Sequence, residues 1–185
     1  MDETFGARRF IPHDRGSPLD EFQKGLVELL PRLRRLARAI ARSDADAQDL
    51  VQETIERCLA KRGGWQAGTR LDSWAFTIMK RIHIDQGRSR TRWSKVVSPE
   101  DERTPQQADA AMAGEELRAD ALAVRGAIQA LPEDQRMAVA LVLIDGLSYA
   151  EAAHVMGVPA GTLTSRLVRG RQTLVQTLAE AGVSA

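Results

Sequence analysis

The sequence predicts an all-α protein made of two small helical domains joined by a flexible linker. Apolar residues recur at spacings of three and four over residues 19–95 and again beyond residue 118, which is the pattern of amphipathic helices. No segment shows sustained alternation of apolar and polar residues, so strands are not expected. Residues 96–117 are rich in small and acidic side chains and hold too little apolar surface to fold alone. We therefore expect a loose tail over 1–18, a first domain over 19–95, a flexible acidic linker over 96–117 and a second domain over 118–185.

Three helices are expected in the first domain. The first begins after Leu19, and its leucine stripe continues past Pro31 either as one helix or as two helices bent at that proline. A second helix follows Ser43 and Asp44 and ends at the two glycines at 63 and 64. The third covers about residues 71–87. The polar face of the first helix carries four arginines: Arg32, Arg35, Arg38 and Arg42. They either follow DNA or merely keep the helix soluble.

Three or four helices are expected in the second domain, over about residues 115–130, 133–145, 148–156 and 160–179. Ser148 and Glu151 have the spacing of a capping box, and Gly157 suits a left-handed turn. These features predict a helix-turn-helix. Its second helix carries short hydroxyl side chains beside arginines, a pattern that fits the major groove of DNA but also fits a helical hairpin with a solvated basic face.

Charge is divided unevenly along the chain. The 26 Lys and Arg residues and 25 Asp and Glu residues give a formal net charge of +1. Residues 1–98 hold 19 basic and 13 acidic side chains, whereas residues 99–185 hold 7 and 12. The basic run from Lys80 to Lys95 includes Trp93, and such interleaving suits single-stranded DNA, although a charged helix end explains it too.

Motifs in both domains resemble the extracytoplasmic-function (ECF) sigma factors of bacterial RNA polymerase. In the second domain the resemblance lies in ALPEDQR (130–136), DGLSYAEAA (145–153) and GTLTSRLVRGR (161–171). In the first domain it lies in DAQDLVQET (46–54) and in WAFTIMKRIHID (74–85) with Arg88. It covers about residues 22–95 and 118–178. One departure is Arg81, where the family usually has Asn, and it affects the contacts expected around the melted strand.

The resemblance implies an alternative sigma factor that directs promoter recognition, promoter melting and transcription initiation. The implied partners are core RNA polymerase, through its β′ clamp helices and β subunit, promoter DNA and an anti-sigma factor. The implied core-polymerase contacts are Asp49, Leu50, Gln52 and Glu53. The implied minus-ten DNA contacts are Lys80, Arg81, Asp85, Arg88, Arg90, Arg92 and Trp93. The implied minus-thirty-five DNA contacts are Ala160, Thr162, Thr164, Ser165, Arg166 and Arg169.

Two other functions fit parts of the sequence. A free-standing helix-turn-helix transcriptional regulator explains residues 130–178 but leaves the motif at 49–54 and the basic segment without a role. A metal-dependent hydrolase that used Asp46, Asp49 and Glu53 would lack an accompanying His and a phosphate-binding loop. A solvated helix face is the plainer explanation of those acids.

No catalytic residue, metal or cofactor is expected, and the protein is not expected to be an enzyme. Cys58 is the only cysteine, which excludes an internal disulfide, and it falls on an apolar face as a small core residue would. The three histidines have no ligand-like neighbours. The longest apolar run, 137–144, is far short of the roughly 20 residues that span a bilayer, and no signal-peptide core is present. We expect a cytoplasmic protein without membrane insertion.

Overall fold

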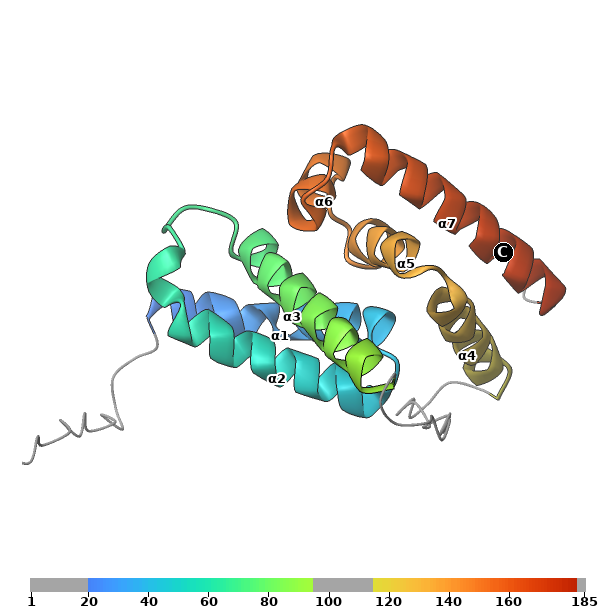
Figure 1. Ribbon diagram of the computed structural model, residues 1–185, viewed down its shortest axis with the longest axis horizontal. Coiled ribbons are helices and arrows are strands. Elements are labelled where there is room, and N and C mark those ends of the chain that lie inside the picture. Colours follow the sequence, from blue (N-terminus) through green and yellow to red (C-terminus); the bar gives the residue numbers. More distant parts are fainter. Residues whose placement is uncertain (1–19, 95–114, 183–185) are drawn as a thin grey trace, which may run out of the picture.

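The computed structural model describes residues 20–94 and 115–182, and over these ranges all regular secondary structure is helical, which confirms the predicted all-α class. The α-helices fall into two bundles on either side of residues 95–114 (Figure 1). The first bundle contains α1 (Glu21–Ile40), α2 (Asp44–Ala60) and α3 (Leu71–Ser94), with a 3-10 turn, η1 (Arg62–Gly64), between the last two. The second contains α4 (Glu115–Ala130), α5 (Glu133–Val139), α6 (Tyr149–Met156) and α7 (Ala160–Glu180). The predicted tail and most of the predicted linker lie outside the described residues, although α4 already begins inside the segment expected to be linker.

Side-chain caps set the starts of α1, α2 and α6. Asp20 and Gln23 form a capping box at α1, and the Ser43 side chain accepts a hydrogen bond from the backbone N–H of Asp46 at α2. The predicted capping box of Ser148 and Glu151 is present at α6. These bonds satisfy backbone N–H groups that have no partner within the helix, and their sequence signals are local, which is why the starts are predictable.

Pro31 does not break the first helix. The helix α1 runs through it as a single element, with buried leucines on both sides of the proline: Leu26, Leu29, Leu33 and Leu36. The proline removes one backbone hydrogen bond, and this continuous buried stripe holds the helix together. Of the two predicted alternatives, one continuous helix is therefore correct, and two helices bent at Pro31 is not.

The structure differs from the predicted helices in two places. The helix α3 continues to Ser94, seven residues beyond the predicted end at Gly87, because a glycine inside a helix costs only about 1 kcal/mol and does not stop it. The segment predicted as one helix over 133–145 is α5 followed by a π-helical turn, η2 (Ala140–Ile144). The backbone N–H of Asp145 closes that wider turn on the carbonyl of Ala140 at 3.0 Å.

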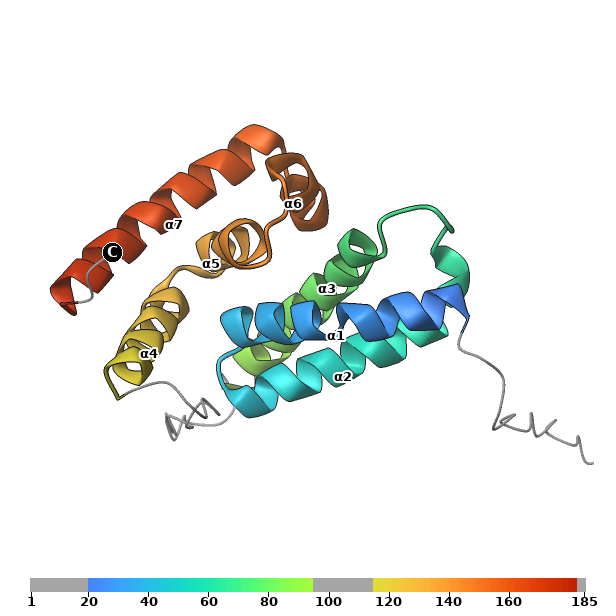
Figure 2. The same ribbon diagram turned by 180° about the vertical axis from the view of Figure 1, so that it is seen from behind.

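The two bundles share one hydrophobic core. Buried apolar residues of α1, α2 and α3 form a single cluster with those of α5, η2, α6 and α7. The helix α1 lies between the bundles: it packs on α2 and α3 on one side and on α4, α5 and η2 on the other (Figure 2). The helix α3 packs on α6. The two helical groups are therefore in direct contact.

Within the second bundle, α7 packs tightly against α5 at Gly170. A Cβ atom added there would lie 2.9 Å from Cγ2 of Val139, a fully buried β-branched side chain that has no room to move. The backbones meet because this position has no side chain.

We predict that Gly170→Ala destabilises the protein by about 1–3 kcal/mol through overpacking. Gly126→Ala is the matched control, since a Cβ at this helical glycine meets nothing within 4 Å, and it should stabilise α4 by about 0.5–1 kcal/mol. Urea denaturation followed by circular dichroism measures both effects. Equal stability of the two variants would contradict the close approach.

Candidate functional site

The outer face of α2 carries the acidic and amide side chains that the sequence predicts as a contact surface. Asp49 and Gln52 are exposed, and Gln52 donates a hydrogen bond to Glu56 at 3.0 Å. Glu53 is turned toward α3: its carboxylate accepts a hydrogen bond from Gln86 of α3 at 2.9 Å, and another from Arg57, one turn further along α2, at 2.5 Å. Asp49 and Gln52 are thus available to a partner, whereas Glu53 ties α2 to α3.

The expected contact role of Leu50 is wrong for its side chain. Leu50 is 0% exposed and belongs to the core cluster. Successive residues of a helix point in directions 100° apart, so a contiguous motif cannot lie wholly on one surface. Leu50 supports the outer face of α2 from within.

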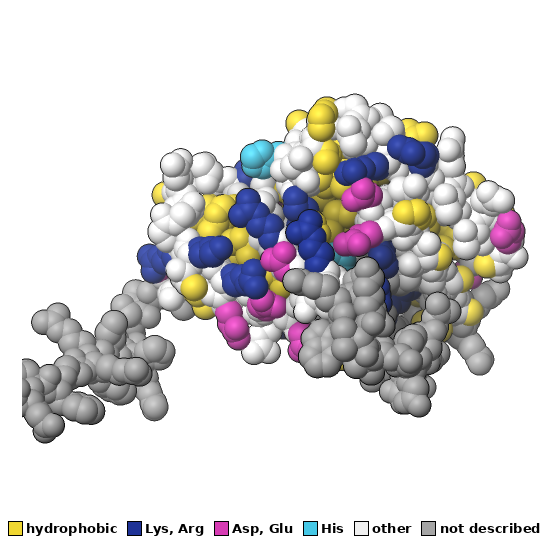
Figure 3. Space-filling view, in the orientation of Figure 1, with side chains coloured by type: hydrophobic (Ala, Val, Ile, Leu, Met, Phe, Trp, Pro, Cys, Tyr) yellow, Lys and Arg dark blue, Asp and Glu magenta, His cyan; other side chains and the backbone are white. Residues whose placement is uncertain are grey.

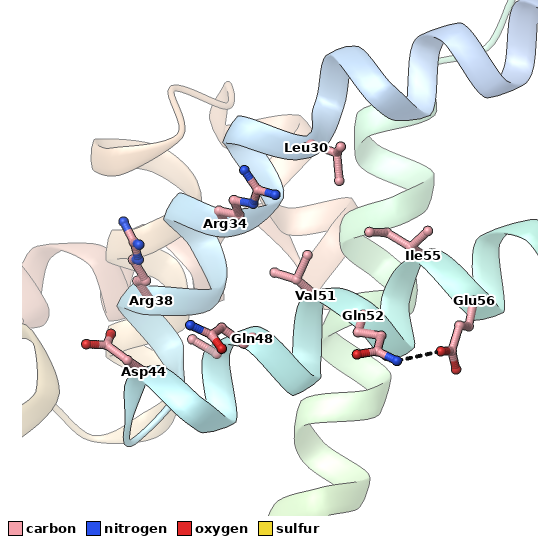
Figure 4. A pocket seen from close by; sticks show the side chains of 10 residues that line it. Leu30, Arg34, Arg38, Asp44, Gln48, Val51, Gln52, Ile55 and Glu56 are labelled. Carbon is pink, nitrogen blue, oxygen red and sulfur yellow. Dashed lines mark hydrogen bonds between the residues drawn. The ribbon is translucent and has the colours of Figure 1, made fainter. Parts of the chain in front are cut away.

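A groove of about 630 Å³ lies between α1 and α2 beside that face (Figure 4). Its apolar floor is formed by Leu30, Val51 and Ile55. Arg34 and Arg38 of α1 line one side, and the polar side chains of α2 line the other: Asp44, Gln48, Gln52 and Glu56. Sequence reasoning missed this groove because its two walls come from different helices, although Ile55 at the edge of the apolar stripe is a local signal for it.

The helix α3 carries the predicted minus-ten residues, and they have different environments. Arg81, Asp85 and Arg88 are exposed, whereas Lys80 is half-buried and donates a hydrogen bond to the backbone carbonyl of Met156 at 2.9 Å. Burial lowers the pKa of Lys80, with a smaller contribution from the neighbouring Arg81. The backbone of the remaining three residues lies in α3, and their side chains are outside the described residues: Arg90, Arg92 and Trp93.

Basic side chains gather over the α2 and α3 side of the first bundle (Figure 3). A small pocket of about 120 Å³ lies there between the end of α2 and the middle of α3. Arg57, Lys61 and Arg81 line it together with Trp74 and Ile78. Trp74 also packs edge-on against Phe22, with ring centroids 6.0 Å apart, so it combines the core role that its apolar stripe indicates with a place at the pocket wall. Cations around an aromatic wall can hold a negatively charged, unstacked nucleic-acid strand.

The helix α7 begins as the second helix of a helix-turn-helix. Gly157 after α6 adopts the left-handed conformation, with φ 67°, and Leu163 and Leu167 anchor α7 in the core. Ala160, Thr164, Ser165 and Arg169 are exposed near the start of α7, and Thr162 is half-buried. Arg169 donates through Nε to the carbonyl of Ser165 at 3.2 Å. A row of short polar side chains and one arginine therefore faces outward.

Two residues of α7 differ from expectation. Arg166 forms an ion pair with Asp134 of α5 at 2.7 Å, and its side chain is 23% exposed, so it is turned toward its own domain rather than outward. Val168 is 47% exposed beside Thr164, one helical turn away, and Arg169. The sequence reasoning passed over Val168 because it adjoins the leucine stripe. An apolar group on such a face can contact a thymine methyl group.

The arginines of α1 do not act as one basic face. Arg32 donates to both carboxylate oxygens of Asp145, at 3.2 and 2.6 Å, and to Asp72 at 2.7 Å. Arg35 lies 3.8 Å from Asp145, and Arg38 lines the groove between α1 and α2. Neither predicted role of this face, in DNA binding or in solubility, accounts for Arg32.

The described residues contain no group of His, Cys, Asp and Glu side chains arranged to hold a metal ion. Among the helices described, none combines the length and apolar character needed to cross a membrane.

The structure joins a helix-turn-helix, which has an exposed polar row, to a second helical bundle with a basic pocket and a grooved polar face. Together these features define a DNA-binding transcription protein. Two family models match its two halves: "Sigma-70, region 4" over residues 121–174 and "Sigma2 domain of PhyR" over residues 26–80. The chain is 32% identical to the ECF RNA polymerase sigma factor EcfG of Rhodopseudomonas palustris, over 84% of this chain and 83% of that protein. It is 36% identical to the ECF sigma factor SigE of Mycolicibacterium smegmatis, over 97% of this chain and 70% of that protein.

A solved structure agrees with these relatives. The sigma factor RpoE of Bartonella quintana, in complex with the anti-sigma factor NepR, is 30% identical and superimposes with a TM-score of 0.73 over 87% of this chain and 98% of that one. The chain belongs to the ECF RNA polymerase sigma factors. It is an alternative sigma factor that directs transcription initiation, as the resemblance implies, and the reading as a free-standing regulator is not favoured.

Asp72 is the titratable group on which the arginines of this region converge. Burial alone raises the pKa of Asp72, but hydrogen bonds from Arg70, from Arg32 and from the backbone N–H of Ser73 outweigh it and lower the pKa from 3.8 to about 2. A carboxylate with a lowered pKa stabilises the fold above its unfolded pKa and loses that contribution as the pH falls toward its folded pKa.

We predict that the free energy of unfolding falls by about 2 kcal/mol between about pH 4 and pH 2 because of Asp72. Asp72→Asn should remove this part of the pH dependence and lower stability at pH 7. Urea denaturation at several pH values measures it, with the exposed Asp85→Asn as control. A wild-type-like acid profile in the Asp72 variant would contradict the assignment.

Proposed function

We propose that residues 19–95 bind core RNA polymerase and the minus-ten element, and that residues 118–185 bind the minus-thirty-five element as duplex DNA. The observation that supports this most is the exposed row Thr164, Ser165 and Arg169 at the start of a capped helix-turn-helix. Two domains that each bind DNA weakly raise each other's effective concentration when one chain carries both. The spacing between the promoter elements therefore contributes to specificity.

The groove between α1 and α2, with Asp49 and Gln52 beside it, is the proposed surface for the β′ clamp helices. Its apolar floor fits the side chains of a partner helix, and its rim offers both charge signs, with arginines from α1 and acids from α2. The β subunit is the second proposed contact of core polymerase, through the second bundle.

The basic side of α3 is the proposed minus-ten surface. Arginines along it would follow the phosphates of the melted strand, and the pocket beside Trp74 would receive an unstacked base. Arg81 adds a positive charge at the mouth of this pocket, where the family usually has Asn, so we expect stronger phosphate contact there.

In the second bundle, Arg169 is the proposed base-edge or phosphate contact and Val168 the proposed apolar contact. Arg166 is given a different role from the one its motif implies: through Asp134 it holds α7 on α5 and positions the reading residues. Ala160 and Thr162 lie at the helix N-terminus, where backbone N–H groups favour a phosphate.

The chemistry of RNA synthesis belongs to the polymerase in this proposal, so the chain itself needs no catalytic residue and no cofactor. Its place of action is the cytoplasm, where the polymerase and the promoters are. An anti-sigma factor is a further proposed partner, since the RpoE structure that matches both bundles contains one.

Run-off transcription with core polymerase, followed by mapping of the start sites, tests the proposed function directly. Specific start sites that require this chain support it. Tight duplex binding by the chain alone, together with no association with core polymerase, would contradict it.

We predict that the double variant Asp49→Ala, Gln52→Ala weakens binding to core polymerase by about 1–2 kcal/mol, or about tenfold in Kd. Both side chains are exposed, so the helical content should not change. Fluorescence anisotropy of the labelled chain titrated with core polymerase measures the loss. Glu28→Gln, an exposed acid on α1, serves as the control and should bind like wild type.

We predict that Arg169→Ala weakens binding of the polymerase holoenzyme to a mapped promoter by about 1–3 kcal/mol if the arginine makes a bidentate contact. Arg171→Ala is the matched control, because this exposed arginine lies two residues on and points to the opposite side of α7. Electrophoretic mobility shift at fixed salt compares them. Equal losses in the two variants would leave only a general electrostatic effect and contradict the assignment.

A further inference from the structure

The small pocket between the end of α2 and the middle of α3 is built from residues of the first bundle alone. Trp74, Ile78 and Arg81 are spaced four and three residues apart, so they share one face of α3. Arg57 and Lys61, which are also four residues apart, line the pocket from the end of α2. Its volume of about 120 Å³ suits a single flat ring and is too small for a base pair.

The aromatic wall of this pocket is held in place by the core. The ring of Trp74 packs edge-on against Phe22, with centroids 6.0 Å apart, and Phe22 packs in turn on Trp65 at 5.4 Å. Phe22 is 2% exposed, and Ile78 beside the tryptophan is buried as well. A ring that is fixed in this way offers apolar surface to a flat ligand and loses little side-chain freedom when the ligand binds.

The guanidinium of Arg81 is available for a ligand. Its neighbour in the pocket, Arg57, already donates to the carboxylate of Glu53 at 2.5 Å. Arg81 is exposed, and no hydrogen bond or ion pair joins its side chain to any other described residue. A guanidinium presents its N–H donors in a planar fork, whereas the ammonium group of Lys61 is a point charge without a fixed direction. Arg81 can therefore recognise two acceptors that lie side by side.

Adjacent acceptors distinguish guanine from the other bases. Guanine O6 and N7 both accept, so a guanidinium binds them through two parallel hydrogen bonds. Adenine presents its N6 amino donor beside N7, and that donor opposes an N–H group of the arginine. Thymine has a methyl group beside O4, so it accepts only one of the two bonds. Cytosine has adjacent acceptors at O2 and N3, but its single ring covers less of the Trp74 wall than a purine does.

We propose that Arg81 selects guanine: the pocket between α2 and α3 takes up one unstacked guanine of the minus-ten strand, with its ring on the Trp74 wall and its O6 and N7 on the guanidinium of Arg81. The inference rests on the proposed function, which brings the melted strand to this side of α3. The positive charge of Arg81 attracts phosphates of any sequence, and its fork of donors adds a preference for one base. Lys61 contributes attraction without a preference.

Gly64 of η1 leaves this pocket open. It is one of the lining residues, and a Cβ atom added there would meet nothing within 4 Å. Its backbone is not among the glycines with positive φ, so a larger residue can take its place without backbone strain. A leucine side chain at this position would compete with the base for the pocket and leave the core undisturbed.

Base preference is measured with short fluorescent oligothymidine strands that differ only in one central base, which is guanine, adenine, cytosine or thymine. The strands are titrated at fixed salt with the full chain and with its complex with core polymerase, and fluorescence anisotropy gives each Kd. We expect the guanine strand to bind about tenfold more tightly than the other strands.

Four variants separate base selection from general attraction. Arg81→Gln should make the adenine strand the tightest, because an amide pairs with N6 and N7 of adenine. Arg81→Ala should abolish the differences between the strands. Lys61→Ala, the matched control, removes another cation of the same pocket and should weaken all strands by the same factor while guanine stays preferred. Gly64→Leu should reduce the affinity for the guanine strand to that for the thymine strand, with a circular dichroism spectrum like that of wild type.

Equal affinities of the wild type for all the strands, no detectable binding, a preference for cytosine, or a guanine preference that survives Arg81→Ala would each overturn the selection of guanine. The proposed function stands in those cases if the chain still associates with core polymerase and gives specific start sites. A chain that does neither would instead overturn the proposed function.

Discussion

The carboxylate of Asp145 sits where water cannot reach it, and the arrangement of the two bundles depends on the guanidinium that compensates it. Burying an unpaired carboxylate is costly enough to prevent the packing altogether. Arg32 removes that cost only if α1 lies at one angle to the π-helical turn, because both nitrogens must meet both oxygens. The apolar core that runs across α1 then closes around this fixed point.

Local signals in the sequence were enough to predict where the helices begin and that the protein is all-helical. Capping residues and apolar spacing act within one helical turn, so Ser43, Ser148 and Gly157 predict their elements without knowledge of the rest. The environments of Leu50 and Arg166 differ from expectation for the opposite reason. A sequence motif gives the order of residues but not the direction in which each side chain points, and the helix points Leu50 into the core. The partner of Arg166 lies 32 residues earlier, in α5, and so outside the motif. The π turn and the full length of α3 depend on tertiary packing that no short window contains.

In the structure, opposite charges of the two halves of the sequence pair with each other. Arg32 and Arg70 of the basic half pair with Asp145 and Glu151 of the acidic half. Part of the positive charge that would attract DNA indiscriminately is therefore neutralised within the chain. Near-neutrality overall and strong charge locally are consistent with a protein that contacts DNA at chosen points and not along its length.

The missing side chain at Gly170 brings the backbones of α5 and α7 together, so the direction of α7 is set by α5 and by residues on the inner side of α7. In the proposed function, the outward residues of α7 are therefore carried by a support that they do not determine. Exchanges among these residues would change the promoter preference and leave the angle between α7 and α5 as it is.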